Sequence, residues 1–277
     1  MNILSRLDLT RRACVMGILN VTPDSFSDGG RFFDSKKAVR HSLAMVNDGA
    51  DIIDVGGEST RPGSRGISAG EELRRVIPVI KALAKRSRIP ISIDTMKSEV
   101  ADEAIRAGAT IVNDVSGLKY DNKMASVAAK HDVSLIIMHM RGTPRNMQLS
   151  PRYRDTVRDI ISDLRLAISK AVKAGVDSRK IVIDPGIGFG KTLRHNLEIL
   201  NRLEEFKELK APICIGTSRK SFIGRVLGVE DPGERIIGTV ATCVIALMKG
   251  ARLIRVHEVK EALQAVRMTE SVLKSGV

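Results

Sequence analysis

Aromatic residues and cysteines are scarce in this chain of 277 residues. Phe, Tyr and Trp together make up 3% of the sequence, and Trp is absent. Proteins that bind single-stranded nucleic acid use aromatic side chains as platforms for the bases, so this shortage argues against that class. The three cysteines, Cys14, Cys214 and Cys243, show no metal-ligand spacing, and their odd number does not suit a disulfide framework. We expect them to be small core side chains in a protein of the reducing cytoplasm.

Long apolar runs are also missing, since no stretch approaches the roughly 20 residues that a membrane span needs. Arg11-Arg12 precede an apolar run, but that run is short, lacks a small-residue cleavage site and leads into a polar Pro-Asp loop. We interpret it as a first strand and not as an export signal. The net charge of +13 comes from Lys and Arg dispersed over helical stretches. This pattern favours solvated helix surfaces over a membrane or nucleic-acid partner, and it would attract a polyanionic small substrate.

What the chain does contain is a series of short apolar runs separated by stretches of helical periodicity. Strands that alternate with helices predict a parallel sheet, and eight such units predict an α/β fold of the (β/α)₈ or TIM-barrel type. The length suits one barrel, and no linker divides the chain, so we expect a single domain over residues 1–277. The runs are Cys14–Leu19, Ile52–Val55, Ile91–Ile93, Ile111–Val112, Leu135–Met138, Ile181–Ile183, Ile213–Ile215 and Leu253–Ile254.

Almost every run ends in a polar residue. In a TIM barrel the C-terminal ends of the strands and the loops after them form the active-site face, so we expect these residues to point into one pocket. They are Asn20, Gly56-Gly57-Glu58, Asp94, Asn113-Asp114, His139, Asp184, Gly216-Thr217-Ser218, Arg255 and His257.

Several of the loops carry further signals. Loops at about 21–34 and 56–68 are rich in turn-forming residues, and we expect both to be mobile. Glycines in 184–192 resemble phosphate-binding motifs, but Pro185 stands where a Walker A loop needs its first glycine, and the spacing also misses the dinucleotide fingerprint. Ser218 is a plausible N-cap of a short helix whose start would favour an anion. Arg255 and His257 alternate onto one side of the last strand, where they could hold phosphate.

Taken together, these segments closely resemble the dihydropteroate synthase family of the pterin-binding barrel superfamily. The most specific matches are the first and the seventh, because wider pterin-binding relatives lack them. One departure is Glu258 after His257, where Asp is commoner in the family. The matching stretches are Gly17–Gly30, Asp54–Gly63, Ile93–Thr95, Asn113–Gly117, Met138–Pro144, Asp184–Thr192, Thr217–Gly224 and Arg255–His257.

The resemblance implies a transferase of folate biosynthesis and a sulfonamide target. Such an enzyme condenses 6-hydroxymethyl-7,8-dihydropterin diphosphate with 4-aminobenzoate, giving 7,8-dihydropteroate and diphosphate with the help of Mg²⁺. It also implies a homodimer. By resemblance, the carbon–oxygen bond breaks early and leaves a carbocation-like methylene, which the aniline nitrogen attacks.

The resemblance further implies a role for individual residues. Asp94, Asn113, Asp184, Lys220 and Arg255 would bind the pterin, and Asp94, Lys220 and Arg255 would act in catalysis. Asn20, Arg255 and His257 would hold the diphosphate, with Asn20 also contacting the metal. The 4-aminobenzoate would lie among Phe26, Thr60, Arg61, Pro62 and Ser221.

Two alternatives remain beside this interpretation. A methyltransferase that uses methyltetrahydrofolate and a corrinoid protein shares the pterin-binding barrel but has no diphosphate to hold, so the Ser218–Ser221 segment speaks against it. A non-catalytic paralogue that binds pterin or pairs with an active subunit would be expected to lose some of Asp94, Asp184, Lys220, Arg255 and His257. All five are present.

Overall fold

The chain forms eight parallel strands that close into one barrel, paired in the order in which they occur in the sequence. The computed structural model describes residues 7–9, 11–22 and 35–275. The predicted (β/α)₈ barrel is confirmed. Its strands are β1 Cys14–Asn20, β2 Ile52–Gly56, β3 Ile91–Asp94, β4 Ile111–Asp114, β5 Ser134–Met138, β6 Ile181–Asp184, β7 Ile213–Ile215 and β8 Ala251–Val256.

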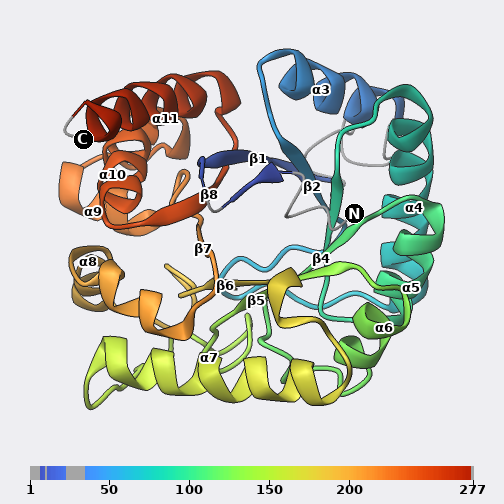
Figure 1. The fold of residues 1–277 in the computed structure, drawn as a ribbon, viewed down its shortest axis with the longest axis horizontal. Helices are drawn as coiled ribbons and strands as arrows, with labels where there is room; N and C mark the ends of the chain where they lie inside the picture. The colour runs from blue at the N-terminus through green and yellow to red at the C-terminus, as the bar shows by residue number, and fades with distance from the viewer. Residues whose placement is uncertain (1–6, 10, 23–34, 276–277) are drawn as a thin grey trace.

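Helices form a ring around the strands (Figure 1). Several are amphipathic and cover the barrel with their apolar side; α4, for example, turns Val76, Val79, Ile80 and Leu83 inward. Ser68 caps the start of α4 by accepting a hydrogen bond from the Glu71 amide, which satisfies one otherwise unpaired helix donor. The helices are α3 Ser35–Asn47, α4 Ala69–Arg86, α5 Ser98–Ala107, α6 Met124–Lys130, α7 Thr156–Lys173, α8 Leu193–Asn201, α9 Ser221–Leu227, α10 Ile236–Met248 and α11 Val259–Lys274, with the 3₁₀ turns η1 Ser178–Lys180, η2 Leu203–Leu209 and η3 Pro232–Arg235.

Strand alternation divides the core into two layers. One set of side chains packs outward against the helices and forms the main hydrophobic cluster, as Val15, Ile53 and Ile93 do. The alternate set faces the lumen of the barrel, because successive side chains of a strand point to opposite faces. This inner cluster is closed from the N-terminal side by Leu7 and Leu9 and contains Cys14, Met16, Ile52, Ile111, Ile136, Val182, Cys214 and Leu253.

Continuing the same alternation toward the C-terminal ends of the strands changes the lumen from apolar to polar. Two residues beyond Ile52, Ile111 and Val182 come Asp54, Asn113 and Asp184, and two beyond Leu253 comes Arg255. All four therefore belong to the lumen-facing set. The lumen is thus apolar toward the N-terminal ends of the strands and lined with charged and amide groups at their C-terminal ends.

The three cysteines are buried and free, which confirms their predicted place in the core. Burial raises the pKa of the Cys14 thiol to about 12, so it stays protonated and unreactive. Among the residues that the structure describes, no helix has the length and apolar character of a membrane span.

Candidate active site

Arg255 organises the polar end of the lumen. Its Nε donates to Oδ2 of Asp54 at 2.6 Å, and its Nη2 donates to Oδ2 of Asp94 at 2.7 Å. The amide of Asn113 also donates to Oδ2 of Asp54, at 3.1 Å. Four residues from β2, β3, β4 and β8 are therefore joined in one hydrogen-bonded chain, and the other edge of the Arg255 guanidinium keeps donors for a ligand.

Burial and the neighbouring charges shift the pKa values of these hydrogen-bonded side chains. It raises the pKa of Asp94 to about 7, although the positive charge of Arg255 acts in the opposite direction. Burial likewise works to lower the pKa of Arg255, but Asp54 and Asp94 more than offset it, so the guanidinium stays charged. Oδ1 of Asp54 and Oδ1 of Asp94 are buried without a hydrogen-bond partner among the described residues. Two acceptors therefore face the lumen unpaired.

Asp184 occupies the opposite side of the lumen, at the end of β6. It is 6% exposed, and its Oδ1 accepts a hydrogen bond from the Gly186 amide at 2.7 Å. Burial raises its pKa, while the charges of Lys220 and Arg255 oppose that rise. The turn after it needs glycine, because Gly186 has φ +72° and a Cβ there would lie 1.9 Å from the His139 carbonyl oxygen. The tight turn fixes the carboxylate at the strand end.

Lys220 reaches the same space from the segment after β7. Its ammonium group donates to the Ile187 carbonyl and lies 4.8 Å from the centre of the Phe189 ring. Burial lowers the pKa of Lys220 to about 8, with the negative charge of Asp184 acting against that shift. Its stem passes 3.1 Å from the position that a Cβ on Gly188 would take, so the glycine leaves room for it.

An apolar wall borders these charges, and the sequence interpretation did not include it among the site residues. Phe189 packs against a separate cluster of Met96, Val115, Met138, Met140 and Met147. Methionine side chains adapt to the faces of planar rings. Met138 is two residues beyond Ile136 on β5, so the alternation of the strand predicts that both face the lumen.

Two predicted pocket residues face outward instead, so for them the prediction was wrong. His139 follows Met138 and is therefore out of phase with the lumen; its Nε2 lies 3.2 Å from Oδ2 of Asp163 on α7. Its Nδ1 lies 3.0 Å from the buried ammonium of Lys191. Asp114 is out of phase as well and accepts from the amides of Ser116 and Leu118, both at 2.8 Å. His139 and Asp114 therefore hold neighbouring segments in place outside the lumen and do not line the pocket.

The segment after β7 also differs from its predicted role. Ser218 does not cap α9, whose N-cap is Lys220 without a side-chain hydrogen bond. The Ser218 hydroxyl lies instead 2.9 Å from Nδ1 of His257 and 3.0 Å from Oε2 of Glu258. Helix geometry needs the cap directly before the first helical residue, and α9 begins at Ser221, two residues later than a Ser218 cap would require.

Ionic contacts anchor the start of the loop after β2. Lys97 contacts the carboxylate of Glu58 and lies 2.6 Å from Oε2 of the buried Glu72. Burial raises the pKa of Glu72, and Lys97 opposes that rise. Further along, the Gly63 amide donates to the Pro144 carbonyl at 3.0 Å, which ties this loop to the loop after β5.

The comparisons with known proteins agree with this geometry. Residues 16–257 match the family of pterin binding enzymes. A dihydropteroate synthase of Bacillus subtilis is 50% identical over 98% of this chain and 93% of its own. A crystal structure of the Clostridium difficile dihydropteroate synthase, in the presence of pteroic acid, superposes with a TM-score of 0.90 at 51% identity, covering 96% of this chain and 98% of that one. The Yersinia pestis enzyme with a sulfonamide drug gives a TM-score of 0.91 at 46% identity and 96% coverage of both chains.

The chain belongs to the dihydropteroate synthase family. The predicted function is confirmed with it: the chain is a transferase that condenses 6-hydroxymethyl-7,8-dihydropterin diphosphate with 4-aminobenzoate to form 7,8-dihydropteroate and diphosphate. These relatives are synthases, so they do not support the methyltransferase alternative.

For a member of this family, the predicted site residues fall into three groups in the structure. Asp94, Asn113, Asp184, Lys220 and Arg255 gather at the polar end of the lumen. Asn20 ends β1 beside Gly56 of β2, and His257 directly follows β8. Thr60, Arg61, Pro62 and Ser221 lie on the rim, and Phe26 lies outside the described residues. The individual roles remain predictions, as does the mobility of the loops at 21–34, most of which is not described, and at 56–68.

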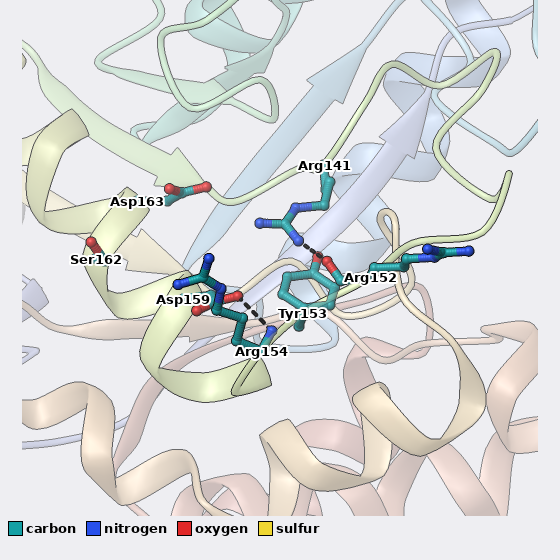
Figure 2. A pocket seen from close by; sticks show the side chains of 7 residues that line it. All are labelled: Arg141, Arg152, Tyr153, Arg154, Asp159, Ser162 and Asp163. Atoms are coloured by element: carbon teal, nitrogen blue, oxygen red, sulfur yellow. Dashed lines mark hydrogen bonds between the residues drawn. The ribbon is translucent and has the colours of Figure 1, made fainter.

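A surface pocket of about 510 Å³ lies between the loop after β5 and the start of α7 (Figure 2). Arg141 stacks over the Tyr153 ring at 4.1 Å, and the Tyr153 hydroxyl donates to the Gly190 carbonyl at 2.8 Å. Its lining is of mixed charge, since Asp159 and Asp163 stand among the arginines. Tyr153 therefore connects the loop after β5 to the loop after β6. The mixed charges of the lining do not favour an ion of either sign.

Proposed function

We propose that Asp184, Asn113 and Asp94 bind the pterin ring at the mouth of the barrel, with Lys220 and Arg255 completing the site. The observation that carries this proposal is the buried pair of unpartnered oxygens on Asp54 and Asp94. A buried acceptor without a donor costs about 1–3 kcal/mol, so donors of a ligand would relieve it. A pterin edge presents N–H and amino donors side by side, which suits an ionised carboxylate such as Asp184. The methionine and Phe189 wall would cover the ring faces.

The diphosphate would lie toward β1 and β8, where Asn20, Arg255 and His257 end their strands. Mg²⁺ would arrive with it, and the residues present fit such an ion. The described residues contain no group of three or more His, Cys, Asp and Glu side chains that could hold a metal. Mg²⁺, however, commonly takes one or two protein oxygens and fills its shell with phosphate and water, so the amide oxygen of Asn20 suffices. When bound, the ion would neutralise charge that develops on the leaving diphosphate.

In the reaction, the bond between the pterin methylene carbon and the diphosphate oxygen breaks, and its electron pair leaves with the diphosphate. Asp94 would stabilise the positive charge that develops on the methylene and pterin, while Arg255 would stabilise the leaving group. The aniline nitrogen of 4-aminobenzoate then forms the new carbon–nitrogen bond and releases a proton. This nitrogen needs no strong base, because its lone pair is already free at neutral pH.

The 4-aminobenzoate would bind at the rim, among Phe26, Thr60, Arg61, Pro62 and Ser221. Arg61 is exposed and Ser221 is the exposed first residue of α9, so both are open to an incoming carboxylate. The drug complex of the Yersinia pestis relative makes a sulfonamide the natural competitor to test at this rim.

The proposed diphosphate and metal sites can be tested by calorimetry with the purified protein. We expect inorganic diphosphate to bind only with Mg²⁺ present, because the ion completes its shell with phosphate oxygens. Diphosphate binding of equal strength in EDTA would contradict the metal assignment.

The activity should have a narrow pH optimum. Asp94 must be ionised to stabilise positive charge, and with a pKa of about 7 it gains a proton as the pH falls below neutrality. Lys220 has a pKa of about 8 and loses its charge as the pH rises above that value. We therefore expect kcat/KM to fall on both sides of roughly pH 7–8. A profile that stays flat from about pH 6 to pH 9 would show that neither group titrates in the free enzyme.

An apolar face on α10 and α11 supports the homodimer. Met248, Met268 and Val272 are 62%, 65% and 56% exposed, and they border a groove of about 280 Å³. Exposed apolar patches of this kind mark association surfaces, and one patch that meets itself across a two-fold axis gives a closed dimer. The groove is lined by Val240, Val244, Met248, Ala265, Met268, Thr269, Val272 and Leu273.

Sedimentation of the wild type should accordingly give twice the chain mass of 30.2 kDa. Met268→Glu should shift it toward the monomer, since a charge would be buried at the contact without a partner. Leu149→Glu is the matched control, because Leu149 is 79% exposed in the loop after β5 and away from this face. A wild type that sediments as a monomer, or a Met268→Glu variant as dimeric as the control, would exclude this surface.

The location that we assign to the enzyme is the cytoplasm. Three buried thiols without a disulfide suit a reducing compartment. The substrates, pterin diphosphate and 4-aminobenzoate, are small charged molecules, which fits an enzyme that has neither nucleic acid nor a membrane as partner.

A further inference from the structure

The hydroxyl of Ser218 is shared by three groups at the end of β8. It lies 2.9 Å from Nδ1 of His257 and 3.0 Å from Oε2 of Glu258, and it accepts from the His257 backbone amide at 3.2 Å. A serine hydroxyl has one proton to donate and two lone pairs to accept with. Three neighbours therefore use its whole capacity, and the direction of each hydrogen bond can be worked out.

Glu258 decides those directions. Its other oxygen, Oε1, pairs with the guanidinium of Arg219, so the carboxylate is ionised and can only accept. The Ser218 proton must then point at Oε2 of Glu258, since otherwise two oxygen lone pairs would face each other at 3.0 Å. With its proton used, Ser218 can only accept from the side chain of His257. Nδ1 of His257 must carry a proton, so in the neutral ring the second nitrogen, Nε2, carries none.

The backbone holds Arg219 in place for this contact. Arg219 has φ +59°, a left-handed conformation that costs a residue with a Cβ free energy. Its amide donates to the Thr239 hydroxyl at 3.2 Å, and its carbonyl accepts from Arg235 at 2.9 Å. These two hydrogen bonds hold the backbone of Arg219 in its strained conformation, which directs the side chain to Glu258. We infer that the ion pair is maintained.

We propose that Glu258, acting through Ser218, is a positioning residue that fixes the neutral tautomer of His257 and leaves Nε2 unprotonated for the ligand. None of the described residues hydrogen-bonds Nε2. Phosphate oxygens accept hydrogen bonds, so this nitrogen cannot donate to a diphosphate until it takes up a proton from solvent. His257 therefore binds the diphosphate as a cation that forms only on binding.

The charges around His257 support this coupling. Burial and the positive charges of Arg219, Arg255, Arg61 and Lys220 lower its pKa to about 3 in the free protein. A bound diphosphate would neutralise those cations and favour the imidazolium. This consequence rests on the proposed diphosphate site, whereas the tautomer itself does not.

Nitrogen-15 NMR of histidine-labelled protein at pH 7, without ligand, tests the tautomer directly. The wild type should show the proton of His257 on Nδ1. In Glu258→Gln, the amide oxygen would stay with Arg219 and the NH₂ would face Ser218, so the Ser218 proton turns to Nδ1 and the ring proton moves to Nε2. A wild-type proton on Nε2, or an unchanged tautomer in Glu258→Gln, would overturn the proposal. His257→Gln assigns the signal.

Calorimetry with inorganic diphosphate and Mg²⁺, in buffers of different ionisation enthalpy, tests the coupling. The wild type should take up close to one more proton than His257→Gln, which corrects for titration of the diphosphate itself. Equal uptake by the two proteins would refute the coupled protonation. Absence of diphosphate binding by the wild type would refute the proposed site and leave the NMR result intact.

Discussion

Replacing Arg255 with methionine is expected to lower the free energy of unfolding by about 3–5 kcal/mol. The guanidinium lies between Asp54 and Asp94, whose side chains are 0% and 10% exposed. Methionine is similar in length but carries no charge, so both carboxylates would stay buried without a cation. Removing one partner of a buried ion pair costs this amount because the remaining charge is uncompensated. Urea unfolding at pH 7.5, above the pKa of Asp94, measures it.

Two further variants separate this effect from general loss of charge. Arg179→Met removes an arginine that is 84% exposed and pairs with Asp177 at the surface, where water screens the pair, so we expect the stability to stay near that of the wild type. Arg255→Lys keeps the charge but not the planar fork, and should retain more stability than the methionine variant while still weakening diphosphate binding. If Arg255→Met were as stable as Arg179→Met, Arg255 would not hold the carboxylates together. If Arg255→Lys bound diphosphate normally, Arg255 would not be a phosphate ligand.

Asp184→Asn should weaken pterin binding by about 2–4 kcal/mol, which corresponds to roughly 30- to 1,000-fold in Kd. The substitution keeps the shape but replaces one acceptor with a donor, so a pterin N–H would meet an NH₂ group. Binding of the pterin can be measured by calorimetry or by its fluorescence.

The matched control for Asp184 is Asp114→Asn. Asp114 also ends a strand and is also buried, but its oxygens accept from the Ser116 and Leu118 amides outside the lumen. It should lose stability while its pterin affinity stays near that of the wild type. Near wild-type affinity in Asp184→Asn, or an equal loss in both variants, would remove Asp184 from the pterin site.

Much of the barrel could be predicted because each strand is encoded locally. The run Ile213–Ile215 coincides with β7, and most other strands extend the predicted run by a residue or more. The extension matters at β3 and β6, where Asp94 and Asp184 are part of the strand and not of the loop. Alternation within the strand therefore decides which way each carboxylate points.

Alternation also explains the errors. Their place directly after strands predicts that His139 and Asp114 line the pocket, but each is one residue out of phase and faces the helices. The contacts of Asp54 were out of reach for a different reason. Asp54 and Arg255 are 201 residues apart and meet only because β8 closes the barrel against β1. Ser218 was assigned to the local helix start, whereas its partners His257 and Glu258 come from the neighbouring strand end.

The synthase assignment is tested most directly by measuring dihydropteroate formation by the purified protein. The assay supplies dihydropterin diphosphate, 4-aminobenzoate and Mg²⁺, and omits each in turn. Product and free diphosphate should form in equal amounts when all three are present, and neither should form when any one is missing. Tight binding of the pterin diphosphate without product would show an inactive paralogue. A protein that neither forms product nor binds the pterin diphosphate would contradict the assignment of the barrel mouth as the synthase site.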